Sequence, residues 1–214
     1  MWVGRAVIFR WSVVAVIVFA AMIWGYFIIT DSQIKESFLP VYGQRNKDST
    51  DHTIANFSLT DQDGKKITEE NFKGKIYVAD FFFTTCEGIC PLMSDQLERI
   101  ALAYKGNENV LLLSHTVKPE EDSIPVLKEY ARLHNADSSQ WHFVTGEKMV
   151  INKLARTSYL VAGEEGNETS DFVHTQFFAL IDTEKRIRGF YDGTDSSEVN
   201  KLISDIGTLL REEY

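Results

Sequence analysis

The sequence predicts an α/β fold in which a mixed central β-sheet is flanked by helices. Three observations support this prediction. Segments of strand character alternate with helical segments along residues 53–214, and the chain closes with two strands and a helix. Two cysteines lie between a strongly apolar run and a predicted helix. A region of about 160 residues is long enough to bury one α/β core.

The domain opens with a small hairpin. Ile54–Leu59 and Lys65–Thr68 are separated by the glycine-containing turn Asp61–Gly64. The apolar run Lys75–Phe83 is too unbroken to face water on one side, so we expect a central strand. Pro91–Tyr104 follows as a helix, because proline is favoured in a first helical turn.

The remaining segments continue the alternation and end in a hairpin and a helix. In order, we expect a buried strand, a helix, a short strand, a helix, two paired strands and a closing helix, at Asn109–Ser114, Ser123–His134, Trp141–Val144, Glu147–Tyr159, His174–Ile181 with Ile187–Tyr191, and Ser196–Glu212. This is the order of elements in a thioredoxin-like sheet.

The N-terminal thirty residues predict one transmembrane helix. Every side chain from Trp11 to Ile29 is uncharged, and a helix of this length spans the ~30 Å hydrocarbon core of a bilayer. A cleaved signal peptide is the alternative, but its apolar region is usually about 7–15 residues long. Arg5 and Arg10 precede the span, so the positive-inside rule predicts a cytoplasmic N-terminus.

We therefore expect a single-pass protein of the cytoplasmic (inner) membrane whose soluble domain lies on the periplasmic, extracytoplasmic side. Its three parts are a membrane anchor (residues 1–30), a polar tether (31–52) and a thioredoxin-like domain (53–214).

The charge balance excludes one class of partner. The chain has 22 Lys and Arg against 31 Asp and Glu, a net charge of −9. An acidic surface argues against nucleic-acid binding, which uses basic patches. We expect no nucleic-acid partner. No heptad or apolar stripe predicts a particular oligomeric state.

Cys86 and Cys90 are the only cysteines, and Cys90 directly precedes Pro91. Their C-x-x-x-C spacing is one residue wider than the C-x-x-C of disulfide oxidoreductases, which leaves room for a metal ion between the sulfurs. A helix N-terminus stabilises negative charge and should lower the pKa of a nearby thiol. Since thiolates are soft donors, this pair favours a soft metal such as Cu(I).

Two thiolates leave a copper ion one or two ligands short. His174 is the best placed of the five histidines, because it precedes a strand expected to pair near the cysteine loop. His115, which closes the second buried strand, is a weaker candidate. We interpret the others as structural, solvated or part of the tether: His134, His142 and His52.

Several blocks of sequence resemble the SCO (SenC) family, thioredoxin-like copper proteins that assist assembly of cytochrome c oxidase. The pattern F-F-x-T-x-C-x-x-x-C-P spans Phe82–Pro91. The stretch Ser114–Asp122 is similar to the family's S-V-D-P-x-x-D loop. The segments around Trp141, His174 and Tyr191 are similar to later family blocks.

The resemblance implies that Cys86, Cys90 and His174 bind copper, as Cu(I), Cu(II) or both. It implies delivery of copper to the dinuclear site of cytochrome c oxidase subunit II, or to another copper protein. Three positions depart from the family pattern. Glu87 replaces a common proline and adds a charge that opposes thiolate formation, Lys118 replaces a common aspartate, and Val173 stands where many relatives carry aspartate.

Other functions remain open from the sequence. The cysteines could act as a redox-active pair, with Cys86 attacking a client disulfide and Cys90 resolving it, as a reductase of the client's copper-ligand cysteines. They could form a structural disulfide bond, or belong to a copper-sensing module. A thiol peroxidase fits less well, because the threonine expected before its reactive cysteine is replaced by Phe83.

Overall fold

The computed structural model describes residues 18–26, 39–46, 48–161 and 175–214. The chain divides into a unit of residues 1–38 and a compact unit, Leu39–Tyr214. In the first unit, residues 18–26 are helical, and the rest of the predicted span Trp11–Ile29 lies outside the described residues. None of the helices in the described residues is both long and apolar enough to span a bilayer.

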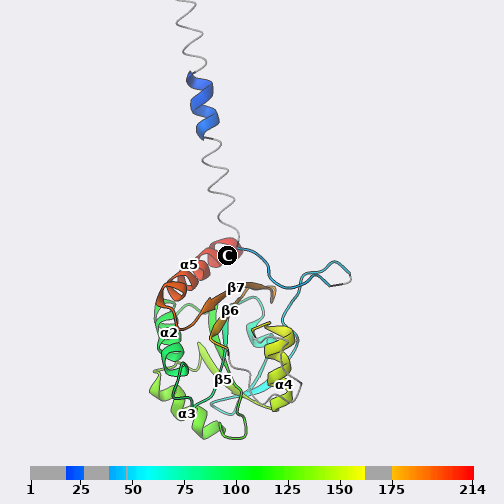
Figure 1. The fold of residues 1–214 in the computed structure, drawn as a ribbon, viewed down its shortest axis with the longest axis vertical. Coiled ribbons are helices and arrows are strands. Elements are labelled where there is room, and N and C mark those ends of the chain that lie inside the picture. Colours follow the sequence, from blue (N-terminus) through cyan, green and yellow to red (C-terminus); the bar gives the residue numbers. More distant parts are fainter. Residues whose placement is uncertain (1–17, 27–38, 47, 162–174) are drawn as a thin grey trace, which may run out of the picture. The chain divides into compact units, whose positions relative to one another are not determined.

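The compact unit is built on a seven-stranded sheet in the order β2-β1-β5-β4-β3-β6-β7 (Figure 1). The central strand β3 pairs with β4 in parallel along its whole length and with β6 antiparallel. The sheet is therefore mixed. Its strands are β1 (Ser58–Asp61), β2 (Lys66–Thr68), β3 (Ile76–Phe82), β4 (Val110–Thr116), β5 (Trp141–Thr145), β6 (Phe177–Ile181) and β7 (Ile187–Asp192).

Helices cover both faces of this sheet (Figure 1). One face packs on α2, α3 and α5, and the other on a short 3₁₀ helix, on α4 and on the π-helical turn that follows it. This arrangement confirms the predicted thioredoxin-like α/β fold. The helical elements are η1 (Glu69–Phe72), α2 (Cys90–Ala103), α3 (Ile124–Leu133), α4 (Lys148–Lys153), η2 (Leu154–Ser158) and α5 (Ser196–Glu213).

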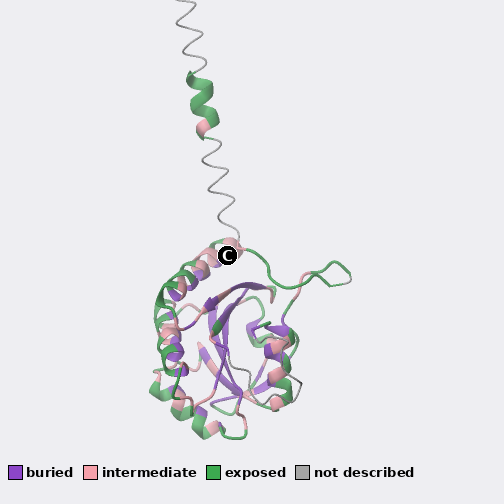
Figure 2. Cartoon of the chain, viewed as in Figure 1, coloured by how far each residue is buried: buried purple, intermediate pink, exposed green. Residues whose placement is uncertain are grey.

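Because successive side chains point to opposite faces of a strand, β3 contributes side chains to two hydrophobic cores. Ile76, Val78 and Phe82 face the helix pair α2 and α5, whereas Tyr77 and Phe81 belong to the opposite core. All seven residues of β3 and all seven of β4 are buried, as expected for strands covered on both faces (Figure 2).

Two local features differ from the sequence prediction. The first strand begins at Ser58 rather than Ile54, because the Ile54 N–H pairs with the Lys185 carbonyl outside the sheet. Helix η1 was not predicted. Thr68 and Asn71 cap it reciprocally and Phe72 is buried beneath it, so two polar residues and one aromatic suffice to form this turn.

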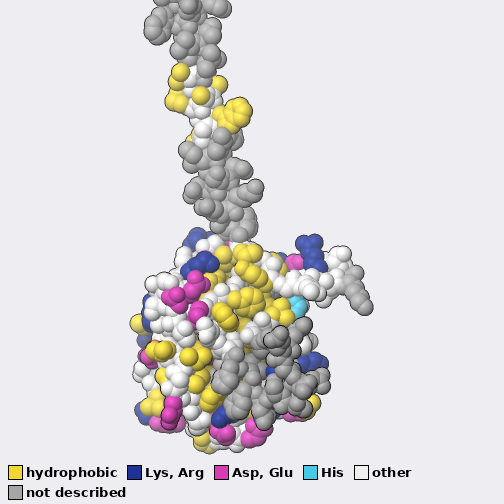
Figure 3. All heavy atoms as spheres, viewed as in Figure 1, with side chains coloured by type: hydrophobic (Ala, Val, Ile, Leu, Met, Phe, Trp, Pro, Cys, Tyr) yellow, Lys and Arg dark blue, Asp and Glu magenta, His cyan; other side chains and the backbone are white. Residues whose placement is uncertain are grey.

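A buried arginine fixes the start of the compact unit. Arg188 is 6% exposed, and its guanidinium donates to Asp182 at 3.1 Å and Glu212 at 3.2 Å. It also donates to the carbonyls of Leu39 at 2.7 Å and Pro40 at 3.2 Å. Residues 39–40 are thereby held against β7 and the end of α5. Elsewhere on the surface, charged side chains of both signs are interspersed among the described residues (Figure 3).

Candidate metal centre

The two cysteines lie where the central strand passes into a helix. β3 ends at Phe82, the Cys86 N–H donates to the Phe83 carbonyl at 3.2 Å, and α2 begins at Cys90. Both are free thiols. Cys86 is partly exposed in the loop, whereas Cys90 is 5% exposed and packs into the core beside α2. One sulfur therefore faces outward and the other inward.

The surroundings separate the pKa values of the two thiols. Partial burial raises the pKa of Cys86, but hydrogen bonds from the Cys90 thiol and from the N–H groups of Cys90, Gly88 and Ile89 outweigh burial and lower it. Burial raises the pKa of Cys90 to about 12, and its hydrogen bond to Cys86 adds to the effect. Cys86 is thus the more acidic thiol of the pair, despite the exposed Glu87 beside it.

Asp122 holds the start of the cysteine loop. This carboxylate is fully buried and accepts hydrogen bonds from the N–H of Thr84 at 3.2 Å and from the Thr84 hydroxyl. It also accepts a hydrogen bond from the hydroxyl of Thr116 at the end of β4. One buried acid therefore ties the loop that carries Cys86 to the neighbouring strand.

A second buried carboxyl, Asp80, lies on the face of β3 toward the cysteines. It is 3% exposed, and its Oδ1 has no hydrogen-bond partner among the described residues. Burial raises the pKa of Asp80 to about 7, although the hydroxyl of Ser114 opposes the shift. The charge of Asp80 in turn contributes to the raised pKa of Cys90. Sequence reasoning missed Asp80, yet it is the only charged residue in the apolar run Ile76–Phe83.

Tyr130 of α3 completes the surroundings of the thiols. Its ring stacks on Phe82 at 5.1 Å, and its hydroxyl lies 2.7 Å from the Ser94 hydroxyl of α2. Burial raises the pKa of Tyr130, with smaller contributions from the charges of Asp80 and Cys90. The cysteine pair is therefore bordered by α2, α3 and the carboxyl end of β3.

Of the two histidines considered as copper ligands, the structure describes only His115. His174 lies outside the described residues, and so do Val173 and the family block around them. His115 is fully buried on the opposite face of the sheet from Cys90, stacked on Phe81 at 4.6 Å. Burial lowers the pKa of His115 to about 4, and its Nδ1 lies 3.2 Å from the Asp80 carbonyl. The structure does not bring His115 to the cysteines.

The side chain of Lys118 contacts Glu121 and Phe83. Its Nζ forms an ion pair with Glu121 at 3.3 Å and lies 4.6 Å from the ring centre of Phe83. The ammonium therefore covers the base of the cysteine loop. Lys118 stands at the position where the family pattern commonly has an aspartate.

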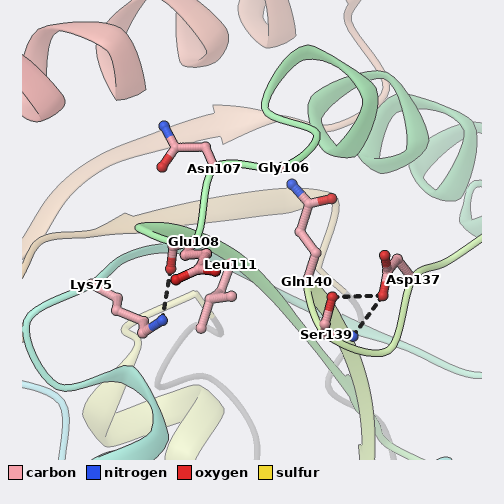
Figure 4. Close-up of a pocket in the computed structure, with 8 residues that line it drawn as sticks. All are labelled: Lys75, Gly106, Asn107, Glu108, Leu111, Asp137, Ser139 and Gln140. Carbon is pink, nitrogen blue, oxygen red and sulfur yellow. Dashed lines mark hydrogen bonds between the residues drawn. The ribbon is translucent and has the colours of Figure 1, made fainter.

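A separate cavity of about 250 Å³ lies at the amino ends of β3, β4 and β5 (Figure 4). Lys75 spans part of it by donating to the Glu108 carbonyl at 2.7 Å, and Asp137 accepts from Ser139. The cysteines follow the carboxyl end of β3, so this cavity is at the other end of the sheet. It contributes nothing to the thiol site.

Known proteins are similar to this chain in fold and in sequence. The chain is 30% identical over 166 residues to the SCO1 protein homolog of Bacillus subtilis (strain 168), covering 77% of this chain and 86% of that protein. A solved structure of BsSco, described as a Sco-family cytochrome c oxidase assembly protein with a disulfide switch, superposes with TM-score 0.64 at 28% identity. It covers 78% of this chain and 98% of BsSco.

Arabidopsis thaliana ScoI, solved with copper bound, has TM-score 0.58 and 28% identity, covering 72% of this chain and 98% of that structure. The SCO1/SenC family model matches residues 45–211, which include both cysteines, the Asp122 loop and the closing hairpin. This chain therefore belongs to the SCO1/SenC family.

Proposed function

We propose that this protein binds one copper ion through Cys86, Cys90 and His174 and delivers it to a copper centre of cytochrome c oxidase, subunit II being the expected client. The observation that carries the proposal is the pair of free thiols in one loop, one of them with a lowered pKa. Relatives described as oxidase assembly proteins and as copper-bound support it.

The two thiols suit capture followed by transfer. A metal-binding cysteine must lose its proton, and the lowered pKa of Cys86 makes this loss easier for Cys86 than for Cys90. Cys90 gives up its proton as the ion binds, which makes affinity fall at low pH. Because Cys86 is partly exposed, a client thiolate can approach the ion and replace the ligands one at a time.

The topology supports His174 as the third ligand. β6 runs antiparallel to β3 with Tyr77 opposite Ile181 and Ala79 opposite Ala179. This register brings the start of β6 beside the end of β3, where the cysteine loop leaves the sheet. His174 is the residue before Thr175, one Cα–Cα step of about 3.8 Å along the chain.

The proposal includes a retained anchor. The uncharged stretch Trp11–Ile29, preceded by Arg5 and Arg10, would hold the chain in the cytoplasmic membrane with its domain on the periplasmic side. Such an anchor would confine the copper site to the membrane surface.

A copper titration of the full chain with reduced thiols tests the proposal. One Cu(I) per chain is expected in the wild type and in the control His52→Ala, whose ring contacts the Ser158 carbonyl instead of the thiols. Tight binding should be lost in Cys86→Ala and Cys90→Ala and weakened in His174→Ala. Full affinity in Cys90→Ala would overturn the proposal.

A thiol–disulfide reductase is the second candidate, favoured by the unequal pKa values of the two thiols. The Cys86 thiolate would attack a client disulfide to give a mixed disulfide and release one client thiolate. Cys90, after losing its proton, would displace the second client thiolate and leave a Cys86–Cys90 disulfide. This route needs no histidine, so reduction of a client disulfide that survives in His174→Ala, without copper binding, would favour it.

A further inference from the structure

We propose that Asp95, Glu98 and His134 form a second metal site on this protein, for a borderline divalent cation such as Zn²⁺ or Cu²⁺. Each side chain offers one ligand atom, and these atoms all lie within 4.8 Å of one another. Among the described residues, no other group of three or more potential ligands converges in this way. The site uses none of the residues assigned to copper delivery.

Two helices build the site. Asp95 and Glu98 are three residues apart on α2, so both project from the same helical face. His134 is the residue that ends α3, and α2 and α3 are neighbours (Figure 1). Asn135 links the same two helices by donating from its side chain to Glu98. The donors therefore come from rigid elements.

Two of the three donors are already oriented. The His134 ring packs at 4.6 Å from the Tyr130 ring and 6.4 Å from the indole of Trp141. Glu98 Oε1 accepts from the Asn135 amide at 2.7 Å, which leaves Oε2 for a cation. Partners that hold a ligand in place commonly strengthen metal sites.

The charges at the site are not otherwise balanced. Like charges three or four residues apart on a helix repel each other. In the part of the chain that the structure describes, neither Asp95 nor Glu98 forms an ion pair with a lysine or arginine. Arg99 is adjacent to Glu98, yet it donates to Gln96 and, at 2.6 Å, to Asn200. A divalent cation would supply the missing positive charge.

The donor set selects the type of metal. The donors are one imidazole nitrogen and two carboxylate oxygens. Ca²⁺ and Mg²⁺ prefer oxygen ligands alone, and Cu(I) prefers sulfur ligands, which this set lacks. Zn²⁺ and Cu²⁺ accept such mixed sets, and Cu²⁺ binds more tightly in the general affinity order. Three protein ligands leave a fourth position for water, so binding should be moderate and reversible.

The site is separated from the thiols along one helix. Asp95 is five residues after Cys90 on α2, about 8 Å along the helix axis at roughly 1.5 Å per residue. A cation held here would lie one to two turns from the cysteine pair, on the outer face of α2.

The test removes the thiols so that it does not depend on the proposed copper function. The full chain carrying Cys86→Ser and Cys90→Ser is titrated with ZnCl₂ by calorimetry. One Zn²⁺ per chain is expected, with affinity at least tenfold weaker after adding His134→Ala or Asp95→Asn. Asp95 is exposed, so Asp95→Asn is expected to fold normally even if loss of the His134 ring perturbs packing.

Two control substitutions in the same background match the residue types. His52→Ala and Glu120→Gln should leave zinc affinity unchanged. With Cu²⁺, electron paramagnetic resonance should show coupling to nitrogen that disappears in His134→Ala. The same zinc isotherm with and without Asp95→Asn would overturn the proposal, whatever the outcome of the Cu(I) titration.

Discussion

Asp122 fixes Thr84 twice, accepting hydrogen bonds from both its backbone N–H and its side-chain hydroxyl. Thr84 is two residues before Cys86, and Asp122 comes from the loop after β4. The position of the thiol loop is therefore set by a buried acid some forty residues away in the sequence, about one strand and one helix later.

Asp122→Asn should weaken copper binding without removing a ligand. The amide cannot accept all the hydrogen bonds that the carboxylate accepts, so the loop should lose its fixed position. A loss of about 10–100-fold in Cu(I) affinity is expected, measured by competition with a chelator. Glu120→Gln, an exposed acid of the same loop, is the control. Equal affinity in the two variants would show that Asp122 does not position the thiols.

Asp80→Asn should stabilise the protein at neutral pH. The native pKa is about 7, above the value of about 3.9 in an unfolded chain, so the folded state binds the proton more strongly. Stability that is present below pH 4 is lost as the pH rises to 7, by about 1.4 kcal/mol per unit. The variant should escape this loss.

Urea unfolding at pH 4 and pH 8 checks this prediction. Asp80→Asn and wild type should match near pH 4, and the variant should be more stable by a few kcal/mol at pH 8. Glu120→Gln changes an exposed carboxyl outside both proposed metal sites and serves as the control. A destabilised Asp80→Asn at pH 8 would mean that the carboxylate makes a stabilising interaction that the amide cannot replace.

Cys86 should react with iodoacetamide at least about tenfold faster than Cys90 at pH 8, because the thiolate is the nucleophile and Cys90 is both buried and of raised pKa. Fragmentation of the singly alkylated protein by mass spectrometry locates the label. In guanidinium chloride the two rates should converge. Faster labelling of Cys90 in the folded chain would reverse the roles assigned to the two sulfurs.

Arg188→Met should destabilise the compact unit strongly. It would leave the mostly buried carboxylate of Glu212 without its arginine and Asp182 with Arg186 as its remaining arginine partner. Breaking a buried ion pair typically costs about 3–5 kcal/mol. Arg132→Met removes an exposed ion pair with Glu129 and should cost less than about 1 kcal/mol. Similar losses in the two variants, measured by denaturant unfolding, would contradict the central role of Arg188.

Much of the fold could be predicted because its signals are local. The buried strands β3 and β4 are continuous apolar runs, and the helix after the cysteines begins with proline. The short helix η1 could not be predicted in this way, since it depends on a reciprocal cap between Thr68 and Asn71. The change from α4 to the π-helical turn η2 likewise leaves no periodic signal.

Only part of the candidate copper site could be predicted from the sequence. Cys86 and Cys90 are marked by their spacing and by the helix that follows, and their positions agree with that expectation. The face on which His115 lies depends on strand register, which a single sequence does not specify. The sequence does not mark Asp80 as part of the site, because a single acidic residue in an apolar run looks like an interruption of the buried pattern. The sequence indicates a structural or solvated role for His134 because it lies at a helix end, and it does not reveal the carboxylates of the other helix that lie beside it.

Arg188 holds Leu39 and Pro40 at one end of the sheet, and the two cysteines lie at the opposite end. Asp182 and Arg188 lie at the end of the sheet where β3 begins, while the thiols follow the end where it finishes. One strand of seven residues, about 23 Å long, separates them. A partner that approaches the thiols would therefore meet a surface about one strand length from the point at which the chain enters the compact unit.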